Sequence, residues 1–268
     1  FTPESLFTAI KDHHVTVLPG VATIFRRLLN SPLFSLGDFS RLRLAVAGAA
    51  PCPWELAVEW QEKSASRIVR GYGMTELFRP LSFRADDPTD LPNAVGKAVP
   101  DVTIRTIDED GSGKDGIGEL WIKSPAMMQC YLDAPDETNE VIADGWFKTG
   151  DLATVPADGF VQMVGRKRER IVRGGYSVFP QEIEAVLLSH PAVAEAAVVA
   201  VPDPDLGEEV AAFVSLKRLE KLTSDELLGY CKEHLARYKY PRRVHIVSEL
   251  PKGPTGKILK SALGKNSA

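Results

Sequence analysis

The first third of the chain alternates short apolar runs with segments in which apolar residues recur at helical spacing. Thr2 and Pro3 are typical of a helix cap and first turn, and Leu6, Phe7 and Ile10 follow at helical intervals. The same alternation predicts further helices at 21–29 and 54–63 and strands at 15–18, 42–47 and 67–70. Strands that alternate with helices in this way are typical of a parallel α/β layer.

Beyond residue 95 the pattern changes twice. Short strands at 102–107, 118–122 and 159–164, separated by turns rich in Gly, Asp and Pro, predict a small β-barrel or sandwich. After Gly165 helices and strands mix, and Thr223 with Glu226 forms a capping box at the start of the longest helix of this part. The remaining elements of this part are predicted at 181–188 (helix), at 195–201, 210–216 and 244–247 (strands), and in a short final helix.

These patterns predict a mixed α/β fold in three parts. Residues 1–94 form an α/β portion, 95–165 a β-barrel subdomain and 166–268 a small α+β domain, with the last boundary at about Gly165 to Arg168.

Composition narrows the class of protein. The 268 residues are 44% hydrophobic and 25% charged, which is typical of a globular protein, and a net charge of −4 argues against a nucleic-acid partner. No apolar run approaches the roughly 20 residues of a membrane helix, and the first residues do not resemble a signal peptide, so a cytoplasmic protein without a membrane segment is expected. Three widely spaced cysteines, Cys52, Cys130 and Cys231, indicate neither a disulfide framework nor a metal site.

Two glycine-containing segments follow predicted strands, at the edge of the sheet where open α/β folds bind ligands. They are Gly48-Ala49-Ala50-Pro51 and the turn Gly71-Tyr72-Gly73-Met74-Thr75-Glu76. In the second, glycines admit a close ligand, Tyr72 can stack on a purine, Thr75 can bind a phosphate oxygen and Glu76 can ligate Mg²⁺. Taken alone, the hexapeptide is also explained by a polar turn whose tyrosine packs inward.

Three further segments change that balance: Gly145 to Asp151 (GWFKTGD), Gly165 to Glu169 (GRKRE) and Pro251 to Lys257 (PKGPTGK). The five segments, in this order and spacing, resemble the carboxyl-terminal half of the adenylate-forming superfamily. That superfamily includes acyl-CoA synthetases, non-ribosomal adenylation domains and beetle luciferases. The resemblance covers nearly the whole chain, and it implies the end of a large adenylation domain followed by a mobile carboxyl-terminal lid.

The resemblance also assigns nucleotide contacts. It implies that Asp151 receives both ribose hydroxyls, that Arg166 contacts the ribose or phosphate, and that Thr75 and Glu76 take part in catalysis, with Glu76 as the Mg²⁺ ligand. The remaining implied nucleotide-binding residues are Gly48, Ala49, Ala50, Gly71, Tyr72, Gly73 and Met74.

The other implied roles lie in the last hundred residues. Lys257 is expected to bridge the attacking carboxylate and the α-phosphate of ATP, where a fixed charge offsets developing negative charge. Arg168 occupies the hinge position, where Asp or Lys is usual, and Gly174 and Gly175 match a segment that lines the coenzyme A tunnel. Two adjacent glycines are equally suited to an ordinary β-turn.

The sequence therefore predicts an acid:coenzyme A ligase that uses ATP, Mg²⁺, a fatty or aromatic acid and coenzyme A. Met74 and the Phe147-Lys148-Thr149 form of the ribose segment favour this branch over a carrier-protein-loading adenylation domain, which is the nearest alternative. The family's phosphate loop, rich in Ser, Thr and Gly and ending in Pro-Lys-Gly, does not occur. A second hypothesis is therefore a fragment that binds AMP and is inactive alone. Arg79 could pair with a second substrate carboxylate, although an exposed surface role is more usual for arginine.

Overall fold

The computed structural model describes residues 1–48, 52–108, 116–253 and 258–263. The chain separates into two compact units, Phe1–Met163 and Val164–Ala268. Each cluster of buried apolar residues described in the structure lies within one unit. None of the helices among these residues is long and apolar enough to cross a membrane.

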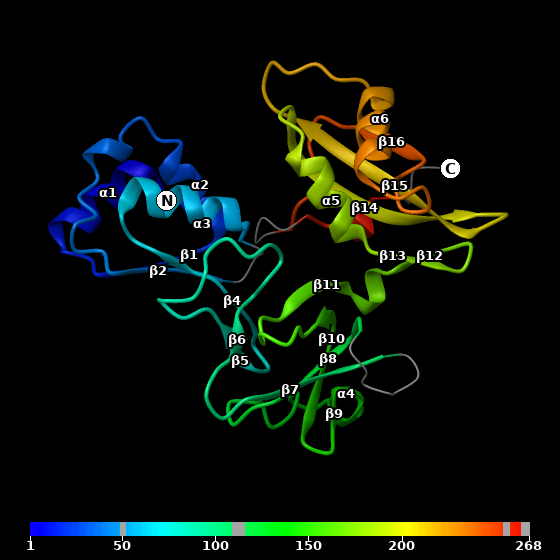
Figure 1. Ribbon diagram of the computed structural model, residues 1–268, viewed down its shortest axis with the longest axis horizontal. Coiled ribbons are helices and arrows are strands. Elements are labelled where there is room, and N and C mark those ends of the chain that lie inside the picture. The colour runs from blue at the N-terminus through cyan, green and yellow to red at the C-terminus, as the bar shows by residue number, and fades with distance from the viewer. Residues whose placement is uncertain (49–51, 109–115, 254–257, 264–268) are drawn as a thin grey trace. The chain divides into compact units, whose positions relative to one another are not determined.

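Unit 1 begins with the predicted parallel α/β layer (Figure 1). Thr2 caps the first helix through a capping box with Ser5, as expected from the sequence. Phe25 and Trp60, both fully buried, meet edge to face at 5.1 Å in the core of this layer. The elements are α1 (Pro3–Asp12), β1 (Val17–Gly20), α2 (Ala22–Leu29), η1 (Phe34–Leu36), β2 (Leu44–Ala47), α3 (Trp54–Ser64) and β3 (Ile68–Val69), with β1, β2 and β3 parallel in that order.

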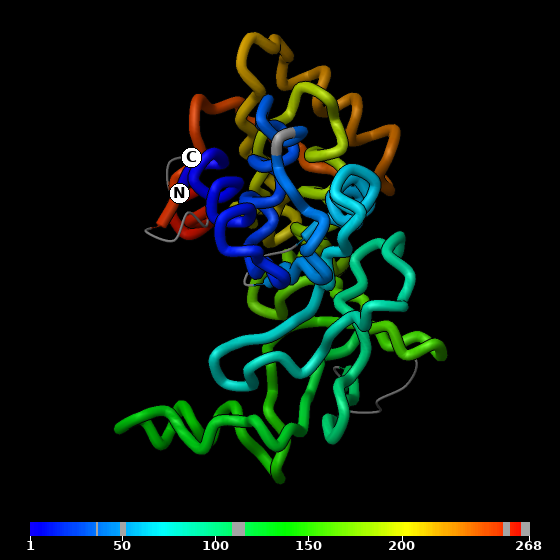
Figure 2. Tube along the Cα trace, turned by 90° about the vertical axis from the view of Figure 1, so that its left-hand side faces the viewer, coloured from blue at the N-terminus to red at the C-terminus, as the bar shows by residue number. Residues whose placement is uncertain are grey.

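The sequence predicted a turn for the glycine-rich hexapeptide Gly71 to Glu76. In the structure most of this segment is a strand. β4 (Gly71–Met74) pairs antiparallel with β5 (Phe78–Ser82), which pairs with β6 (Lys97–Ala98) in a separate three-stranded sheet. Only Thr75, Glu76 and Leu77 form the connecting turn. The passage from the α/β layer into this sheet can be followed in cyan in Figure 2.

A five-stranded antiparallel sheet follows, in the region where a β-barrel subdomain was predicted. Buried side chains from two of its strands, Leu120 and Ile122 on one and Phe147 and Ala153 on the other, form its core together with Leu77 and Leu81. The elements are β7 (Thr103–Ile107), β8 (Gly118–Lys123), α4 (Pro135–Val141), β9 (Ile142–Ala143), β10 (Trp146–Thr154) and β11 (Gln162–Arg166), in the order β11-β10-β8-β7 with β9 beside β10.

Unit 2 is an α+β fold built on a second five-stranded sheet. Thr223 caps α6 through the predicted capping box with Glu226. The elements are η2 (Lys167–Glu169), β12 (Ile171–Arg173), β13 (Tyr176–Val178), α5 (Pro180–Ser189), β14 (Val193–Asp203), β15 (Gly207–Leu216), α6 (Ser224–His234), β16 (Arg243–Ile246) and η3 (Lys260–Ala262), with strand order β13-β12-β15-β14 and β16 parallel to β15.

Side chains along β14 and β15 alternate between the two faces of the sheet, apart from a register shift between Val193 and Glu195, and both faces are apolar. One face, which includes Val198 and Ala212, packs with α5 and α6. The other face, which includes Ala197 and Phe213, packs with Leu250 and the carboxyl-terminal tail. Leu250, Ile258 and Leu263 of this tail therefore cover the face of the sheet that α5 and α6 leave open.

Candidate functional site

Two of the predicted nucleotide-binding residues meet in unit 1. The hydroxyl of Tyr72, on β4, donates a hydrogen bond of 2.5 Å to Oδ2 of Asp151, on β10. These residues are 79 positions apart in the chain. Since a hydrogen bond to a charged acceptor is short and strong, the tyrosine holds the carboxylate in a defined position.

A bulge in β10 places Asp151. This residue lies inside the strand, where the register between β10 and β8 shifts between Lys148 and Leu152. Thr149 Oγ1 donates to the carbonyl of Leu120 at 2.7 Å and accepts from the backbone N–H of Asp151 at 3.1 Å. Bulges turn a side chain away from the regular alternation of its strand. The Thr149 hydroxyl therefore fixes the backbone that carries the carboxylate.

Gly150, at the centre of this bulge, has φ of +70°, and its backbone N–H donates to Oε1 of Glu119 at 3.2 Å. A left-handed backbone of this kind favours glycine. The glycine of the Lys-Thr-Gly-Asp segment is thus explained by the shape of the strand.

The glycines of β4 have packing reasons of their own. A Cβ atom on Gly73 would lie 2.0 Å from the carbonyl oxygen of Phe78, and one on Gly71 would lie 2.5 Å from Nε of Arg79. The sequence interpretation gave these glycines to ligand approach. The close β4–β5 pairing requires the first of them whether or not a ligand binds.

Arg79 is half-buried rather than exposed, which corrects the usual expectation for a surface arginine. One of its guanidinium nitrogens, Nη2, donates to the carbonyl of Val69 at 3.3 Å, and burial lowers its pKa. The guanidinium lies against Gly71, so it packs beneath the strand that carries Tyr72.

The turn after β4 brings in a residue that sequence reasoning missed. Tyr131 donates from its hydroxyl to Oε1 of Glu76 at 2.8 Å, and burial together with the Glu76 carboxylate raises the pKa of Tyr131. The backbone carbonyl of Glu76 also accepts from the N–H of Met128 at 2.7 Å. No motif marked Tyr131, because its role depends on a contact across 55 residues.

The surroundings of Glu76 suit a substrate-bridged Mg²⁺ ion. Within the part of the chain that the structure describes, no three His, Cys, Asp or Glu side chains gather to hold a metal ion. Mg²⁺ commonly uses one or two carboxylates together with substrate phosphates and water, and a carboxylate that accepts one hydrogen bond keeps further lone pairs. Glu76 therefore fits as a single protein ligand. Thr75, beside it, is exposed.

The predicted Gly48-Ala49-Ala50-Pro51 loop is described only at its first residue. Gly48 follows β2 directly, and its N–H donates to the carbonyl of Gly20 at 3.2 Å. Ala49 and Ala50 lie outside the described residues, as does Lys257.

Unit 2 holds the predicted hinge. Arg166 ends β11 with its side chain 3.6 Å from Glu169, and Arg168 is exposed in η2. Arg173, further along the same unit, is buried. Its side chain pairs with Glu209 at 2.8 Å, with only 5% and 7% of the two side chains exposed.

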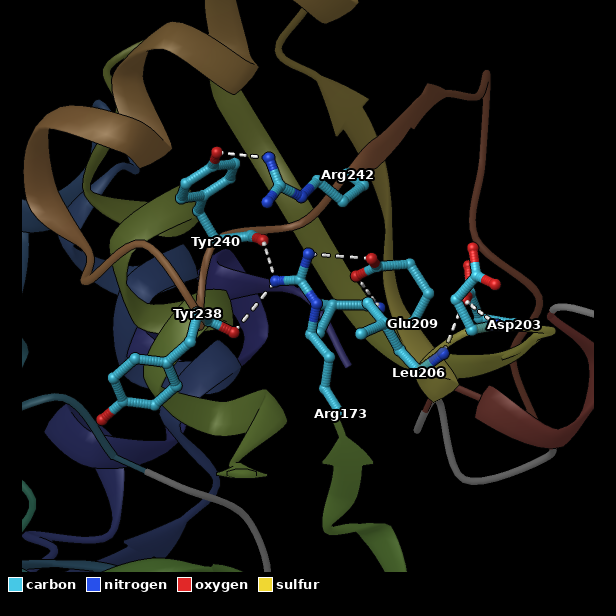
Figure 3. Close-up of polar contacts among 9 residues, drawn as sticks. Arg173, Asp203, Leu206, Glu209, Tyr238, Tyr240 and Arg242 are labelled. Atoms are coloured by element: carbon cyan, nitrogen blue, oxygen red, sulfur yellow. Dashed lines mark hydrogen bonds and ion pairs between the residues drawn. The ribbon is translucent and has the colours of Figure 1, made fainter. Parts of the chain in front are cut away.

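Arg173 fixes the hairpin that carries the predicted coenzyme A glycines. Its Nη1 donates to the carbonyl of Tyr238 at 2.9 Å and to that of Tyr240 at 3.4 Å, while Nη2 faces Glu209 (Figure 3). The next two residues, Gly174 and Gly175, have φ of +54° and +84°. Positive φ at both central positions is what a type I′ hairpin turn needs. The glycines form the β12–β13 turn, and both are exposed.

Known proteins match nearly all of the chain. The profile of the AMP-binding enzyme family matches residues 1–132, and that of the AMP-binding enzyme C-terminal domain matches residues 182–257. A long-chain-fatty-acid–CoA ligase of Yersinia pestis is 40% identical over 252 residues, which make up 92% of this chain and 44% of the ligase. The chain thus spans about half the length of the curated relatives it matches.

Solved structures with a similar fold belong to the same class of enzymes as these sequence relatives. ATP-bound MatB from Rhodopseudomonas palustris superposes with a TM-score of 0.89 at 33% identity, covering 98% of this chain and 53% of MatB. The amide bond synthetase McbA from Marinactinospora thermotolerans gives 0.91 at 31% identity, with 98% and 54% covered. The fold is that of the adenylate-forming enzymes. Within that class, the chain belongs to the AMP-binding enzyme family.

Proposed function

We propose that the chain supplies the adenosine-binding and lid portions of an ATP-dependent acid:coenzyme A ligase. In the first step of that reaction the substrate carboxylate attacks the α-phosphate of ATP and pyrophosphate leaves. In the second, the coenzyme A thiol attacks the acyl-AMP and AMP leaves. The contact between Tyr72 and Asp151 carries this proposal, because it joins the two motifs that the family uses for adenosine.

Each residue has a distinct proposed task. The Asp151 carboxylate accepts hydrogen bonds from the ribose diol, and the Tyr72 hydroxyl orients it while the ring offers a face to adenine. Glu76, oriented by Tyr131, holds Mg²⁺ against the phosphates with Thr75 beside it. Arg166 adds a ribose or phosphate contact, and Arg168 is the hinge. Lys257 stabilises the charge that develops at the α-phosphate.

AMP binding by the chain itself tests the adenosine site. Asp151→Asn should weaken AMP binding about 10-fold or more, since hydrogen bonds to charged groups contribute about 1.5–3 kcal/mol. Tyr72→Phe should weaken it less, because the ring remains. Calorimetric titration of the 268-residue chain measures both, with Asp38→Asn as the control, since that carboxylate only caps Ser40. Equal AMP affinity in Asp151→Asn and the unmodified chain would disprove the site.

Catalysis is tested in a chimera, because the chain spans about half the length of its relatives and resembles the carboxyl-terminal half of the superfamily. The amino-terminal portion of the Yersinia pestis ligase is joined to residues 1–268, and ATP–pyrophosphate exchange is measured with a panel of fatty and aromatic acids. A solved neighbour is itself an RpMatB-BxBclM chimera. We expect exchange in the chimera and none at a comparable rate in the chain alone. Full-rate exchange by the chain alone would refute the expectation of an incomplete enzyme.

Lys257→Ala in the chimera should abolish exchange while thioester formation from supplied acyl-AMP survives. Retained exchange would refute the role given to this lysine. The acceptor is identified by product analysis with coenzyme A, a phosphopantetheinyl carrier protein and an amine. The amine is included because one structural neighbour is an amide bond synthetase. Transfer to the carrier alone would favour the carrier-loading alternative.

A further inference from the structure

Arg79 is a half-buried cation to which the proposed function gives no role. Among the described residues its guanidinium makes one hydrogen bond, from Nη2 to the carbonyl of Val69 at 3.3 Å. Its Nε–H is enclosed without an acceptor, and burial lowers its pKa with no carboxylate of the described residues to oppose the effect. A guanidinium carries five N–H donors, so most of its capacity for hydrogen bonds is unused. A buried charge without a partner is costly, which makes this cation a candidate ligand-binding group.

The guanidinium lies at the edge of the parallel sheet where open α/β folds bind their ligands. Val69, whose carbonyl receives its hydrogen bond, is the last residue of β3. The neighbouring strand β2 pairs Val46 with Val69 and is followed directly by Gly48. A Cβ atom on Gly48 would meet none of the described atoms within 4 Å. The carboxyl ends of these two strands therefore offer a cation on one and space on the other.

Arg79 also lies against the face of β4 that carries no side chains. Tyr72 and Met74 pack against the apolar core of the antiparallel sheets, and the alternate positions of β4 are the glycines Gly71 and Gly73. A Cβ atom on Gly71 would lie 2.5 Å from Nε and 2.6 Å from Nη2 of Arg79, so the guanidinium takes the place of a side chain there. Gly73 is exposed. A group that approaches the glycine face of β4 therefore meets this guanidinium.

An irregularity in β5 accompanies this placement of Arg79. Tyr72 pairs with Leu81 and Met74 pairs with Phe78, so β5 has one residue more than β4 between the two pairs. Phe78, directly before Arg79, has φ of +58°, which is a left-handed backbone on a bulky residue. Bulges redirect side chains, and strained backbones of this kind cluster at ligand-binding sites. The chain thus bears a conformational cost at the point where Arg79 turns toward the glycine face.

We propose that Arg79 binds a second carboxylate of the acid substrate, so that the enzyme selects dicarboxylic acids over hydrocarbon acids of the same length. This proposal rests on the proposed function, because acyl-AMP formation joins the acyl group to the nucleotide that Tyr72 and Asp151 hold. A carboxylate matches the planar fork of a guanidinium with two parallel hydrogen bonds. A hydrocarbon tail in the same place would instead remove water from an unpaired cation, which is unfavourable.

Calorimetric titration of the 268-residue chain with stable acyl-AMP analogues, the N-acylsulfamoyl adenosines, tests the proposal. Acyl chains of increasing length are each made with a terminal carboxylate and with a terminal methyl group. At the best length, the carboxylate should strengthen binding about 10-fold, as expected for a charge-assisted pair. Arg79→Met should abolish this preference, and Arg79→Lys, which keeps the charge but not the fork, should retain part of it. Arg26→Met is the matched control, because Arg26 already pairs with Glu59 in the same unit.

Titration of the same variants with AMP separates failure of this proposal from failure of the proposed function. A carboxylate preference that is absent at every length, or that survives in Arg79→Met, would overturn the role of Arg79 while AMP binding stands. An equal loss of AMP affinity in folded Arg79→Met would overturn it too, because the cation would then serve the nucleotide phosphate. If the unmodified chain bound neither AMP nor any analogue, the adenosine site would be wrong and this proposal would fall with it. Arg79→Gln, also neutral, repeats the test if circular dichroism shows that Arg79→Met does not fold.

Discussion

At the scale of single residues, unit 2 contains a charge pair that is almost wholly removed from water. Arg173 and Glu209 satisfy each other, and Arg173 also satisfies the carbonyls of Tyr238 and Tyr240. The backbone N–H of Val210 donates to the other oxygen of Glu209 at 2.7 Å. A buried pair with this many partners is weak evidence of net stabilisation, but removing one member leaves an uncompensated charge.

Arg173→Met should therefore destabilise unit 2 by about 3–5 kcal/mol, since it leaves the Glu209 carboxylate buried and unpaired. The double variant Arg173→Met with Glu209→Leu should recover part of this loss, because the charge is removed as well. Urea denaturation followed by circular dichroism measures both. A loss below about 1 kcal/mol in the single variant would show that Glu209 is not confined as the structure has it.

At the scale of elements, two glycines differ in whether their surroundings leave room for a side chain. Gly73 sits in β4 against the carbonyl oxygen of Phe78, with no room for a Cβ atom. Gly229 lies inside α6, where an added Cβ would meet nothing within 4 Å. The first glycine is required by pairing between strands, whereas the second only weakens its helix.

Gly73→Ala should destabilise unit 1, by an amount within the usual 1–3 kcal/mol of overpacked sites, and should weaken AMP binding because β4 carries Tyr72. Gly229→Ala should stabilise unit 2 by about 0.5–1 kcal/mol, the difference in helix propensity. Thermal unfolding of both variants tests the contrast. If Gly73→Ala were neutral, the close β4–β5 pairing would be incorrect.

The sequence predicted some of these helices and strands correctly and missed others. The starts of the two helices with clear caps, at Thr2 and Thr223, were predicted correctly because capping is local chemistry. β4 was missed because two glycines in four residues weaken the sequence signal of a strand. Its pairing with β5 is a tertiary contact that the local sequence does not show. The bulge that directs Asp151 depends on the carbonyl of Leu120, which no local pattern reveals.

In the candidate site, too, the sequence indicated some residues and the structure alone revealed others. Resemblance named Tyr72 and Asp151, and the structure brings them together. Tyr131 had no sequence signal, since its partner is distant in the chain. Arg173 lies on the same face of its strand as the buried Ile171, and only the structure shows the carboxylate and the carbonyls that it meets there.

At the scale of the whole molecule, the two units have separate apolar cores. Independent cores allow independent cooperative unfolding. Scanning calorimetry of the chain should therefore show two transitions, and Arg173→Met should lower only the one that belongs to unit 2. A single transition that shifts as a whole would mean that the units unfold together.

The hydrogen bond from Val198 to Glu184 has a consequence for solubility. β14 stands at the end of its sheet's strand order, and the outer edge of a strand is a template on which another chain can pair. The carboxylate of Glu184 takes an N–H in the middle of that edge, and Lys260 places a cation beside it. That N–H is therefore not available to a strand from a neighbouring molecule, which makes pairing of this edge with another chain less favourable.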